Sequence, residues 1–259
     1  MDIICLDSTD STNNWVAQNE DKLPSPSMVR CHSQIAGRGQ RGNTWESEPG
    51  KNFTGTVLFH PLTFPATSQF LISEAIALAV VNTLAFFGIR AKVKWPNDVY
   101  VGDRKICGIL VEHVIMGNVI SRTLAGIGIN VNQKIFISDA PNPTSMALEK
   151  NREYDIDNVA EILADKILEN LYEINALNPG KDREKYFDYG KNINSKIIHE
   201  KFLSHLWRKD GSFHHFIDKK RDEIINAQIE NVVPDGILYL RTELGDLREF
   251  AFKEVEFVL

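Results

Sequence analysis

The chain has 259 residues, and its 29 Lys and Arg against 35 Asp and Glu give a formal net charge of −6 and a pI near 5.7. With 43% hydrophobic and 25% charged residues, the composition is that of a globular protein and excludes disorder, collagen and coiled coil. An acidic chain has no general attraction for nucleic acid or anionic lipid, although a local basic site can still bind phosphate. The length predicts one large domain, alone or with a small appendage.

Cysteine usage and the N-terminal residues bear on the cellular compartment. The three cysteines, Cys5, Cys31 and Cys107, are far apart and form no C-x-x-C motif, so neither a disulfide framework nor a zinc site is expected. The N-terminal residues have no basic start and no long apolar run, which argues against a signal peptide. We therefore expect a cytoplasmic protein with reduced thiols and with neither DNA nor a membrane as partner.

The first half of the chain predicts strands around one apolar helix. A strand over Met28 to Gln34 is followed by sixteen residues, Gly37 to Asn52, whose glycines and proline forbid long regular structure. Loops of this length in compact domains are usually functional or disordered. The apolar run from Phe70 to Phe87 is interrupted by polar residues, so it predicts a buried helix rather than a membrane span. Short β-branched runs between Ala91 and Ala125 predict an antiparallel meander.

The second half predicts a surface helix and then a separate β domain. Apolar residues at helical spacing indicate a helix from Asp157 to Leu177. From about Ile193 onward, strand-like pieces with glycine turns favour a small barrel. The predicted fold class is therefore α+β, with a mixed, largely antiparallel central sheet, flanking helices and a small C-terminal β-barrel. The predicted domains are residues 1–190 and 191–259. The role of the polar insertion at 192–220 stays open, and around Trp207 to Phe216 a structural hairpin is favoured over a contact for a partner protein.

Four histidines lie in this C-terminal part, at positions 199, 205, 214 and 215. Their spacing is irregular and no Cys accompanies them, so surface or hairpin positions are favoured over metal binding.

Arginine within the glycine-rich loop is the first chemical signal. Gly37 to Gly42 reads G-x-G-x-x-G, but prolines and glycines follow where a dinucleotide-binding fold needs a helix. Arg38 and Arg41 can instead form bidentate pairs with a carboxylate or a phosphate. The alternative is a solvated basic loop.

A second cluster is KWPND, residues 94–98, followed by Lys105. Trp95 and Pro96 force a bend, so Asn97 and Asp98 project from a turn where oxygen ligands for Mg²⁺ can gather, and a hairpin brings Lys105 back toward them. An Asx turn with a surface lysine explains the same residues equally well.

A third element is GIGINVN, residues 126–132. Its small residues permit a ligand to approach the strand backbone, and the amide of Asn130 can bind phosphate or metal. Glycine bulges and core packing explain the pattern nearly as well.

Together these motifs resemble the bacterial biotin protein ligases (biotin–[acetyl-CoA-carboxylase] ligases), in the form that lacks an N-terminal DNA-binding domain. The resemblance is carried by five motifs in order: DSTN from Asp10, Q-x-A-G-R-G-x-x-G from Gln34, KWPND from Lys94, DRK-x-x-G-I-L-V-E from Asp103, and GIGIN from Gly126. It implies a catalytic domain similar to the class II synthetases and a small SH3-like C-terminal domain. Since the first motif begins at Asp10, we expect a ligase that does not bind operator DNA.

The resemblance also implies a reaction and a set of site residues. The family joins biotin to ATP as biotinyl-5′-AMP, using Mg²⁺, and transfers biotin to one lysine of a biotin carboxyl carrier protein. The implied catalytic residues are Arg38, Lys105 and Asp98. The implied biotin-binding residues are Ser11, Thr12, Gln34, Gly37, Arg38, Lys105, Gly108 and Gly126. The implied adenylate-binding residues are Arg38, Gln40, Arg41, Trp45, Asn97, Lys105 and Asn130, and the implied metal ligands are Asp98 and Asn130.

One departure from the family pattern and two alternatives stay open. Gln40 stands where the family often has arginine, so one guanidinium that would help to retain the adenylate is missing unless Arg41 replaces it. The alternative functions are a lipoate or octanoate ligase or transferase of the same fold, and a non-catalytic biotin sensor. The motifs leave open whether the protein is a monomer or a homodimer, and whether Asp98 is a metal ligand or a general base.

Overall fold

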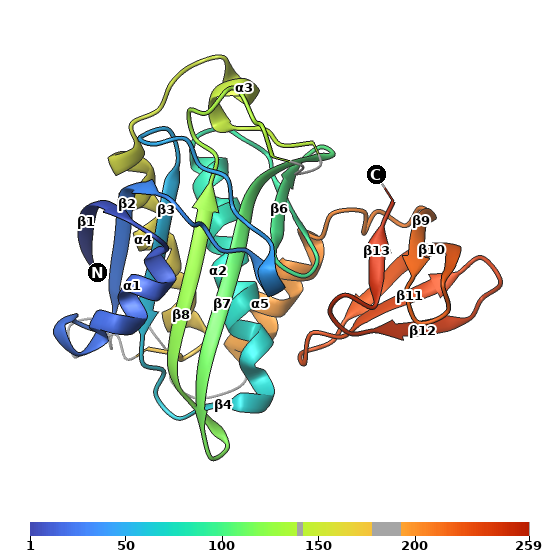
Figure 1. Ribbon diagram of the computed structural model, residues 1–259. Helices are drawn as coiled ribbons and strands as arrows, with labels where there is room; N and C mark the ends of the chain where they lie inside the picture. Colours follow the sequence, from blue (N-terminus) through green and yellow to red (C-terminus); the bar gives the residue numbers. More distant parts are fainter. Residues whose placement is uncertain (139–141, 178–192, 259) are drawn as a thin grey trace.

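The computed structural model describes residues 1–138, 142–177 and 193–258, without the side chains of Arg41, Ile193 and Asn194 (Figure 1). Its main sheet has the strand order β1-β2-β3-β8-β7-β6-β5, and the short β4 pairs with β8. The pairing of β1 with β2 is parallel, and the other pairings in this sheet are antiparallel. The strands are β1 (Asp2–Thr9), β2 (Ser27–Gln34), β3 (Phe53–Phe59), β4 (Phe64–Pro65), β5 (Lys92–Lys94), β6 (Asp98–Val101), β7 (Arg104–Met116) and β8 (Val119–Ile129).

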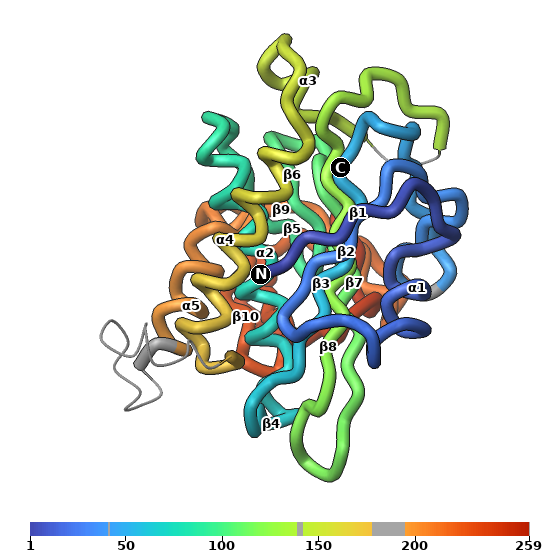
Figure 2. The backbone as a smooth tube through the Cα atoms, turned by 90° about the vertical axis from the view of Figure 1, so that its left-hand side faces the viewer, coloured from blue at the N-terminus to red at the C-terminus, as the bar shows by residue number. Residues whose placement is uncertain are grey.

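Helices cover both faces of this sheet. Helix α1 lies on one face, while α2, α4 and α5 form a layer on the other (Figure 2). The helices are α1 (Thr12–Asn19), α2 (Gln69–Phe86), α3 (Met146–Lys150), α4 (Ile156–Glu173) and α5 (Ile193–Ser204). Three short 3₁₀ segments complete the described elements, at Glu20–Lys22, Gln40–Gly42 and Ala66–Ser68.

Alternation along β3 explains the two faces. Its residues are buried throughout, and the odd positions Phe53, Val57 and Phe59 join the large core below α2 and α4. Leu58 points the other way, into a smaller core with Val16 of α1. Because successive side chains in a strand point to opposite faces, one apolar strand serves both cores.

Helix α2 is the centre of the larger core. By length and composition the segment Ala66–Phe86 could cross a membrane, but 72% of its apolar window is buried inside the protein. The helix packs on α4 and α5 and on strands of the sheet, so apolar residues on all of its sides are covered. The predicted buried helix is thus confirmed, within one residue at each end.

The C-terminal residues form a second, five-stranded antiparallel sheet in the order β12-β11-β10-β9-β13. Its strands are β9 (His214–Asp218), β10 (Glu223–Val232), β11 (Leu238–Thr242), β12 (Leu247–Phe250) and β13 (Val255–Phe257).

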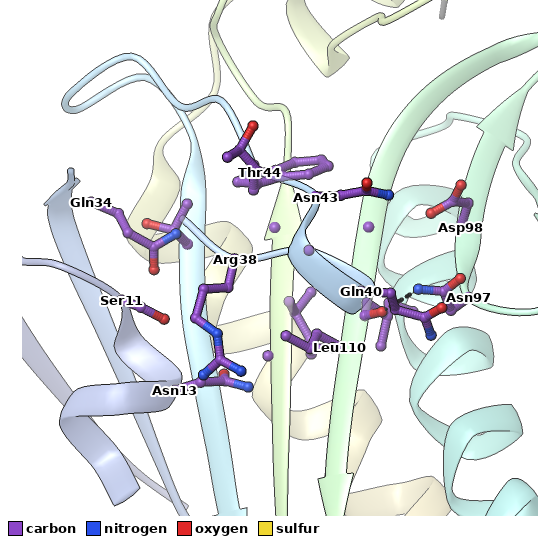
Figure 3. Close-up of a pocket in the computed structure, with 18 of the residues that line it drawn as sticks. Ser11, Asn13, Gln34, Arg38, Gln40, Asn43, Thr44, Asn97, Asp98 and Leu110 are labelled. Atoms are coloured by element: carbon purple, nitrogen blue, oxygen red, sulfur yellow. Dashed lines mark hydrogen bonds between the residues drawn. The ribbon is translucent and has the colours of Figure 1, made fainter. Parts of the chain in front are cut away.

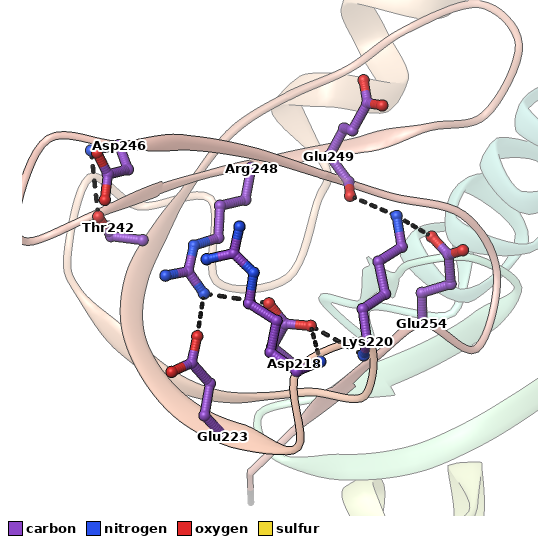
Figure 4. A network of polar contacts seen from close by, with 9 residues as sticks. Asp218, Lys220, Glu223, Thr242, Asp246, Arg248, Glu249 and Glu254 are labelled. Atoms are coloured by element: carbon purple, nitrogen blue, oxygen red, sulfur yellow. Dashed lines mark hydrogen bonds and ion pairs between the residues drawn. The ribbon is translucent and has the colours of Figure 1, made fainter.

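One buried carboxylate joins several parts of this sheet (Figure 4). Asp218, only 2% exposed, accepts hydrogen bonds from the backbone N–H of Lys220 (3.0 Å) and of Arg221 (3.3 Å). It also pairs with Arg248 (3.1 Å), which binds Glu223 as well (2.6 Å). These contacts connect the β9–β10 turn to β12.

The two sheets, with helices on both faces of the larger one, confirm the predicted α+β fold with a small C-terminal β unit.

The two sheets meet at the motif around Trp95. The indole Nε1 of Trp95 donates to the carbonyl of Gly236 (3.0 Å), and its ring packs edge-on against Phe252. Val93 of β5 exchanges backbone hydrogen bonds with His205 and Trp207 (both 2.8 Å). The segment that carries Asn97 and Asp98 is therefore held from behind by the C-terminal part of the chain.

The segment after Ile193 differs from expectation. It is not strand-like: Ile193–Ser204 is helix α5, and its buried residues Ile198 and Phe202 are spaced four apart on the side that packs on α2 and α4. The helix packs with the larger unit, and the hairpin expected around Trp207 to Phe216 lies after it in the chain. The predicted boundary at 190/191 lies outside the described residues. His199 is also not a surface residue, since its side chain is 18% exposed and pairs with the buried Glu74.

Candidate functional site

A cavity of about 730 Å³ opens on the α1 face of the main sheet (Figure 3). It is built from the start of α1, the end of β2 with the loop that follows, part of β3, the β5–β6 turn, and strands β7 and β8, with Ser138 and Lys253 also lining it. The lining residues include Ser11, Asn13, Gln34, Arg38, Gln40, Asn97, Asp98, Lys105, Gly108 and Gly126.

Glycines form the floor of the cavity and create room for Trp45. Gly108 of β7 and Gly128 of β8 lie opposite each other in the sheet. A Cβ atom on Gly108 would come within 2.9 Å of the Trp45 ring, and one on Gly128 within 2.4 Å. The indole therefore lies against bare backbone at this point. Its Nε1 is buried and has no hydrogen-bond partner among the described residues.

A lysine and a carboxylate meet at one end. The β6–β7 hairpin places Asp98 opposite Gly108 and returns Lys105 toward it, so that Lys105 Nζ lies 2.7 Å from Asp98 Oδ1. The same Nζ lies 5.7 Å from the centre of the Trp45 ring. Asn97 donates its amide N–H to the carbonyl of Ile109 (2.6 Å), which leaves its oxygen as the group that can bind a ligand.

The loop after β2 carries the second cation. Its ends are joined by a bridge between Arg38 and Thr44 and by a hydrogen bond from Gly39 N to Asn43 O (2.7 Å). The guanidinium of Arg38 pairs with Glu112 of β7 (2.9 Å) and donates to Asn14 (2.6 Å). Arg38 and Lys105 thus each form an ion pair with a carboxylate, Glu112 and Asp98 respectively.

Polar groups gather where α1 begins. The parallel pairing of β1 with β2 puts Gln34 beside Thr9, and the chain then turns directly into α1. Gln34 Oε1 accepts a hydrogen bond from the backbone N–H of Thr12 (3.0 Å). Ser11 and Thr12 are each 3% exposed, so this end of the cavity is narrow and polar.

A buried thiol lies next to Lys105 in sequence. Burial raises the pKa of Cys107 well above its usual value, and the neighbouring Asp98 carboxylate adds to the shift. The thiol therefore stays protonated at neutral pH and is not a nucleophile.

Most of the residues predicted from the sequence line this cavity. The ones that it brings together are Ser11, Thr12, Gln34, Arg38, Gln40, Trp45, Asn97, Asp98, Lys105, Gly108 and Gly126. Gly37 is not a lining residue: a Cβ there would lie 2.5 Å from the Trp45 carbonyl, so it permits a close backbone approach instead. The side chain of Arg41 lies outside the described residues.

Asn130 is placed differently from expectation. It does not line the cavity, and its side chain is 3% exposed. Its amide N–H donates to the carbonyl of Thr144 (2.9 Å), and its Oδ1 has no hydrogen-bond partner among the described residues. The predicted contact of Asn130 with adenylate or metal is therefore not part of the observed cavity.

Other lining residues were missed from the sequence. Asn13 belongs to the DSTN motif, so the motif itself was a signal for it. Thr54 and Gly55 lie in β3, where they read as ordinary strand residues. Lys253 comes from the turn before β13, more than a hundred residues from any motif, and no local pattern marks it.

A sequence model described as the "Biotin/lipoate A/B protein ligase family" matches residues 4–132, and the cavity is built mainly from these residues. This part of the chain belongs to that family. The family segment is 35% identical over 129 residues to a biotin–[acetyl-CoA-carboxylase] ligase of Paracoccus denitrificans, and covers 49% of this chain and 53% of that one. It is 34% identical over 130 residues to the bifunctional ligase/repressor BirA of Escherichia coli, covering 50% and 40% of the two chains. The match thus spans about half the length of these relatives or less.

The family fold extends over the whole chain. The structure resembles the biotin protein ligase from Aquifex aeolicus in complex with biotin and ATP, with a TM-score of 0.76, 22% sequence identity and 99% of each chain covered. At this identity the likeness concerns the fold, including the second sheet.

Proposed function

We propose that this protein is an ATP-dependent biotin protein ligase. It activates biotin as biotinyl-5′-AMP and transfers the biotinyl group to a lysine of a biotin carboxyl carrier protein. The observation that carries the proposal is one cavity in which Arg38, Lys105 and Trp45 meet the polar residues Thr12 and Gln34. The family match is compatible with either acid, and the biotin ligases among the relatives favour biotin over lipoate.

The reaction has two displacement steps. In the first, an oxygen of the biotin carboxylate attacks the α-phosphorus of ATP, and pyrophosphate leaves. In the second, the ε-amine of the carrier lysine attacks the acyl carbon, and AMP leaves with the electron pair of the broken C–O bond. Both nucleophiles belong to the substrates, and burial raises the pKa of the nearby thiols of Cys31 and Cys107.

The protein supplies position and positive charge. The Thr12 and Gln34 end would hold the polar ureido ring, and Trp45 offers its flat face to adenine. Arg38 and Lys105 would leave Glu112 and Asp98 to bind the carboxylate and the α-phosphate. Such preorganised donors act on the charge that develops in the transition state. Asp98, once released from Lys105, would orient either Mg²⁺ or the amine of the carrier lysine.

The lining residues also fit Mg²⁺. Among the described residues no group of three His, Cys, Asp or Glu could hold a metal ion alone. Mg²⁺ is usually held by one or two carboxylates together with substrate phosphates, so Asp98 and the oxygen of Asn97 are a sufficient protein contribution. The ion would neutralise charge on the phosphates of ATP.

The proposal is tested by transfer of biotin to a purified biotin carboxyl carrier domain in the presence of ATP and Mg²⁺, with lipoate as the competing acid. We expect ATP-dependent biotinylation that falls about 10²- to 10³-fold in Lys105→Ala. Arg104→Ala is the matched control, because this neighbouring cation is exposed and pairs with Glu149 outside the cavity. Tight biotin binding without transfer would favour a sensor, and transfer of lipoate would favour the related activity.

A further inference from the structure

A continuous chain of hydrogen bonds runs along the polar end of the cavity. It begins at Gln34, whose Oε1 accepts from the backbone N–H of Thr12 (3.0 Å). The hydroxyl oxygen of Thr12 lies 2.8 Å from that of Thr56 in β3. Thr56 lies 2.5 Å from Asn13 Oδ1 and is 0% exposed, so no water competes for these contacts.

The chain ends at the ion pair of the glycine-rich loop. Asn13 donates its Nδ2–H to Glu112 Oε2 (2.7 Å), and the other carboxylate oxygen of Glu112 binds Arg38 (2.9 Å). Asn13 fits here because Gly126 lies beneath it: a Cβ on Gly126 would come within 2.4 Å of Asn13 Oδ1. Five segments of the chain are linked in this way, although Thr56 itself does not line the cavity.

The direction of every proton in this chain follows from Glu112. A carboxylate only accepts hydrogen bonds, so it fixes Nδ2 of Asn13 toward itself and turns Oδ1 toward Thr56. An amide oxygen also only accepts, so the single hydroxyl proton of Thr56 must go to it. The hydroxyl oxygens of Thr12 and Thr56 lie 2.8 Å apart, and this contact then takes the proton of Thr12 in preference to the longer contact of Thr12 Oγ1 with Gln34 Oε1 (3.3 Å).

These hydrogen-bond directions determine which donors and acceptors the cavity presents to a ligand. Because its proton is directed at Thr56, Thr12 can present only lone pairs to the cavity. Gln34 has its oxygen occupied by the Thr12 N–H, so it can present only its amide N–H groups. A ligand at this end therefore needs an N–H donor opposite Thr12 and an acceptor opposite Gln34.

We infer that Thr56 is a positioning residue that holds Thr12 as a hydrogen-bond acceptor and thereby sets the preference of the pocket for an N–H-bearing ligand. The inference rests on the proposed function, because the ureido ring of biotin carries N–H groups and a carbonyl oxygen. A valine at position 56 keeps the shape but removes the hydroxyl. It leaves Asn13 Oδ1 without a donor and allows the Thr12 hydroxyl to turn toward the ligand.

The test compares biotin with an analogue in which the ureido N–H groups are replaced by oxygen, by calorimetric titration. In the wild type we expect the analogue to bind at least about tenfold more weakly than biotin, since an acceptor then faces an acceptor. In Thr56→Val, biotin should bind about tenfold more weakly, and the difference between the two ligands should shrink. Thr56→Ser keeps the hydroxyl and should restore the wild-type difference.

Two further variants separate positioning from stability. Thr123→Val is the matched control, since Thr123 is a buried threonine of β8 that bonds His113 and does not line the cavity. It should lower stability without changing the ratio of the two affinities. Glu112→Gln acts at the far end of the chain and should reduce the ratio even if Thr56→Val fails to fold.

Equal ratios in wild type, Thr56→Val and Glu112→Gln, with biotin bound, would overturn the inference and leave the proposed function intact. A wild type that binds neither ligand would contradict the proposed function itself and the inference with it.

Discussion

Trp45 owes its position to two residues without side chains. Gly108 and Gly128 face each other across β7 and β8, and the indole ring occupies the space that two Cβ atoms would fill. From the sequence these glycines read equally well as bulges or as packing positions, because the partner that needs the space is over sixty residues away from either. The charged and polar side chains of the cavity were easier to predict, because they belong to the sequence motifs themselves.

Gly128→Ala should weaken ATP binding. Its methyl group would lie 2.4 Å from Trp45, on the backbone of a central strand that cannot move, so the indole must shift. We expect the KM for ATP to rise about tenfold or more, with a smaller change in the KM for biotin. Steady-state kinetics with each substrate varied in turn checks this, and an unchanged KM for ATP would contradict the placing of adenine on Trp45.

Gln40→Arg should slow the release of the adenylate. Gln40 lines the cavity on the same loop as Arg38, so a guanidinium there can reach the phosphate that Arg38 binds. We expect release of biotinyl-5′-AMP, followed by filter binding, to slow about tenfold. Gln40→Met keeps the length of the side chain but removes its polar group, and serves as the uncharged control. Equal release from both variants would show that position 40 does not contact the phosphate.

Helices α2 and α5 are joined by one buried ionisable pair. Glu74 of α2 is 1% exposed, and its Oε1 lies 2.7 Å from His199 Nδ1 of α5. Burial raises the pKa of Glu74, and the hydrogen bond to Glu74 raises the pKa of His199 above 6.5. The sequence predicted α2 well because its apolar run is long. It did not predict α5, whose buried side chains pack on α2, more than a hundred residues away in the sequence.

The stability of the protein should therefore depend on pH through this pair. A histidine with a raised folded pKa contributes stability that is complete below the unfolded pKa of about 6.5 and is lost as the pH rises through the folded pKa. We expect the free energy of unfolding to fall above pH 6.5 in the wild type and to fall less in Glu74→Gln. Urea unfolding at a series of pH values measures both, and parallel curves for the two proteins would contradict the assignment.

At the scale of the whole molecule, the two sheets meet beside the β5–β6 turn, which carries Asn97 and Asp98. The class of the fold and the antiparallel pairing of β5 to β8 could be predicted from short β-branched runs and turn residues. The contact between the two sheets could not be predicted, because Trp95 and its partners Gly236 and Phe252 lie more than 140 residues apart in the sequence. Lys253 follows Phe252, so the C-terminal part of the chain adds a cation to a site built mainly from residues 4–132.

The most direct test of this account is formation of the adenylate without any carrier protein. Purified protein is mixed with ATP, Mg²⁺ and biotin, and the release of pyrophosphate and the appearance of biotinyl-5′-AMP are followed together. We predict a biotin-dependent burst of both products in equal amounts, reduced by about two orders of magnitude in Arg38→Ala. No burst, or an equal burst with lipoate in place of biotin, would contradict the assignment of this cavity to biotin activation.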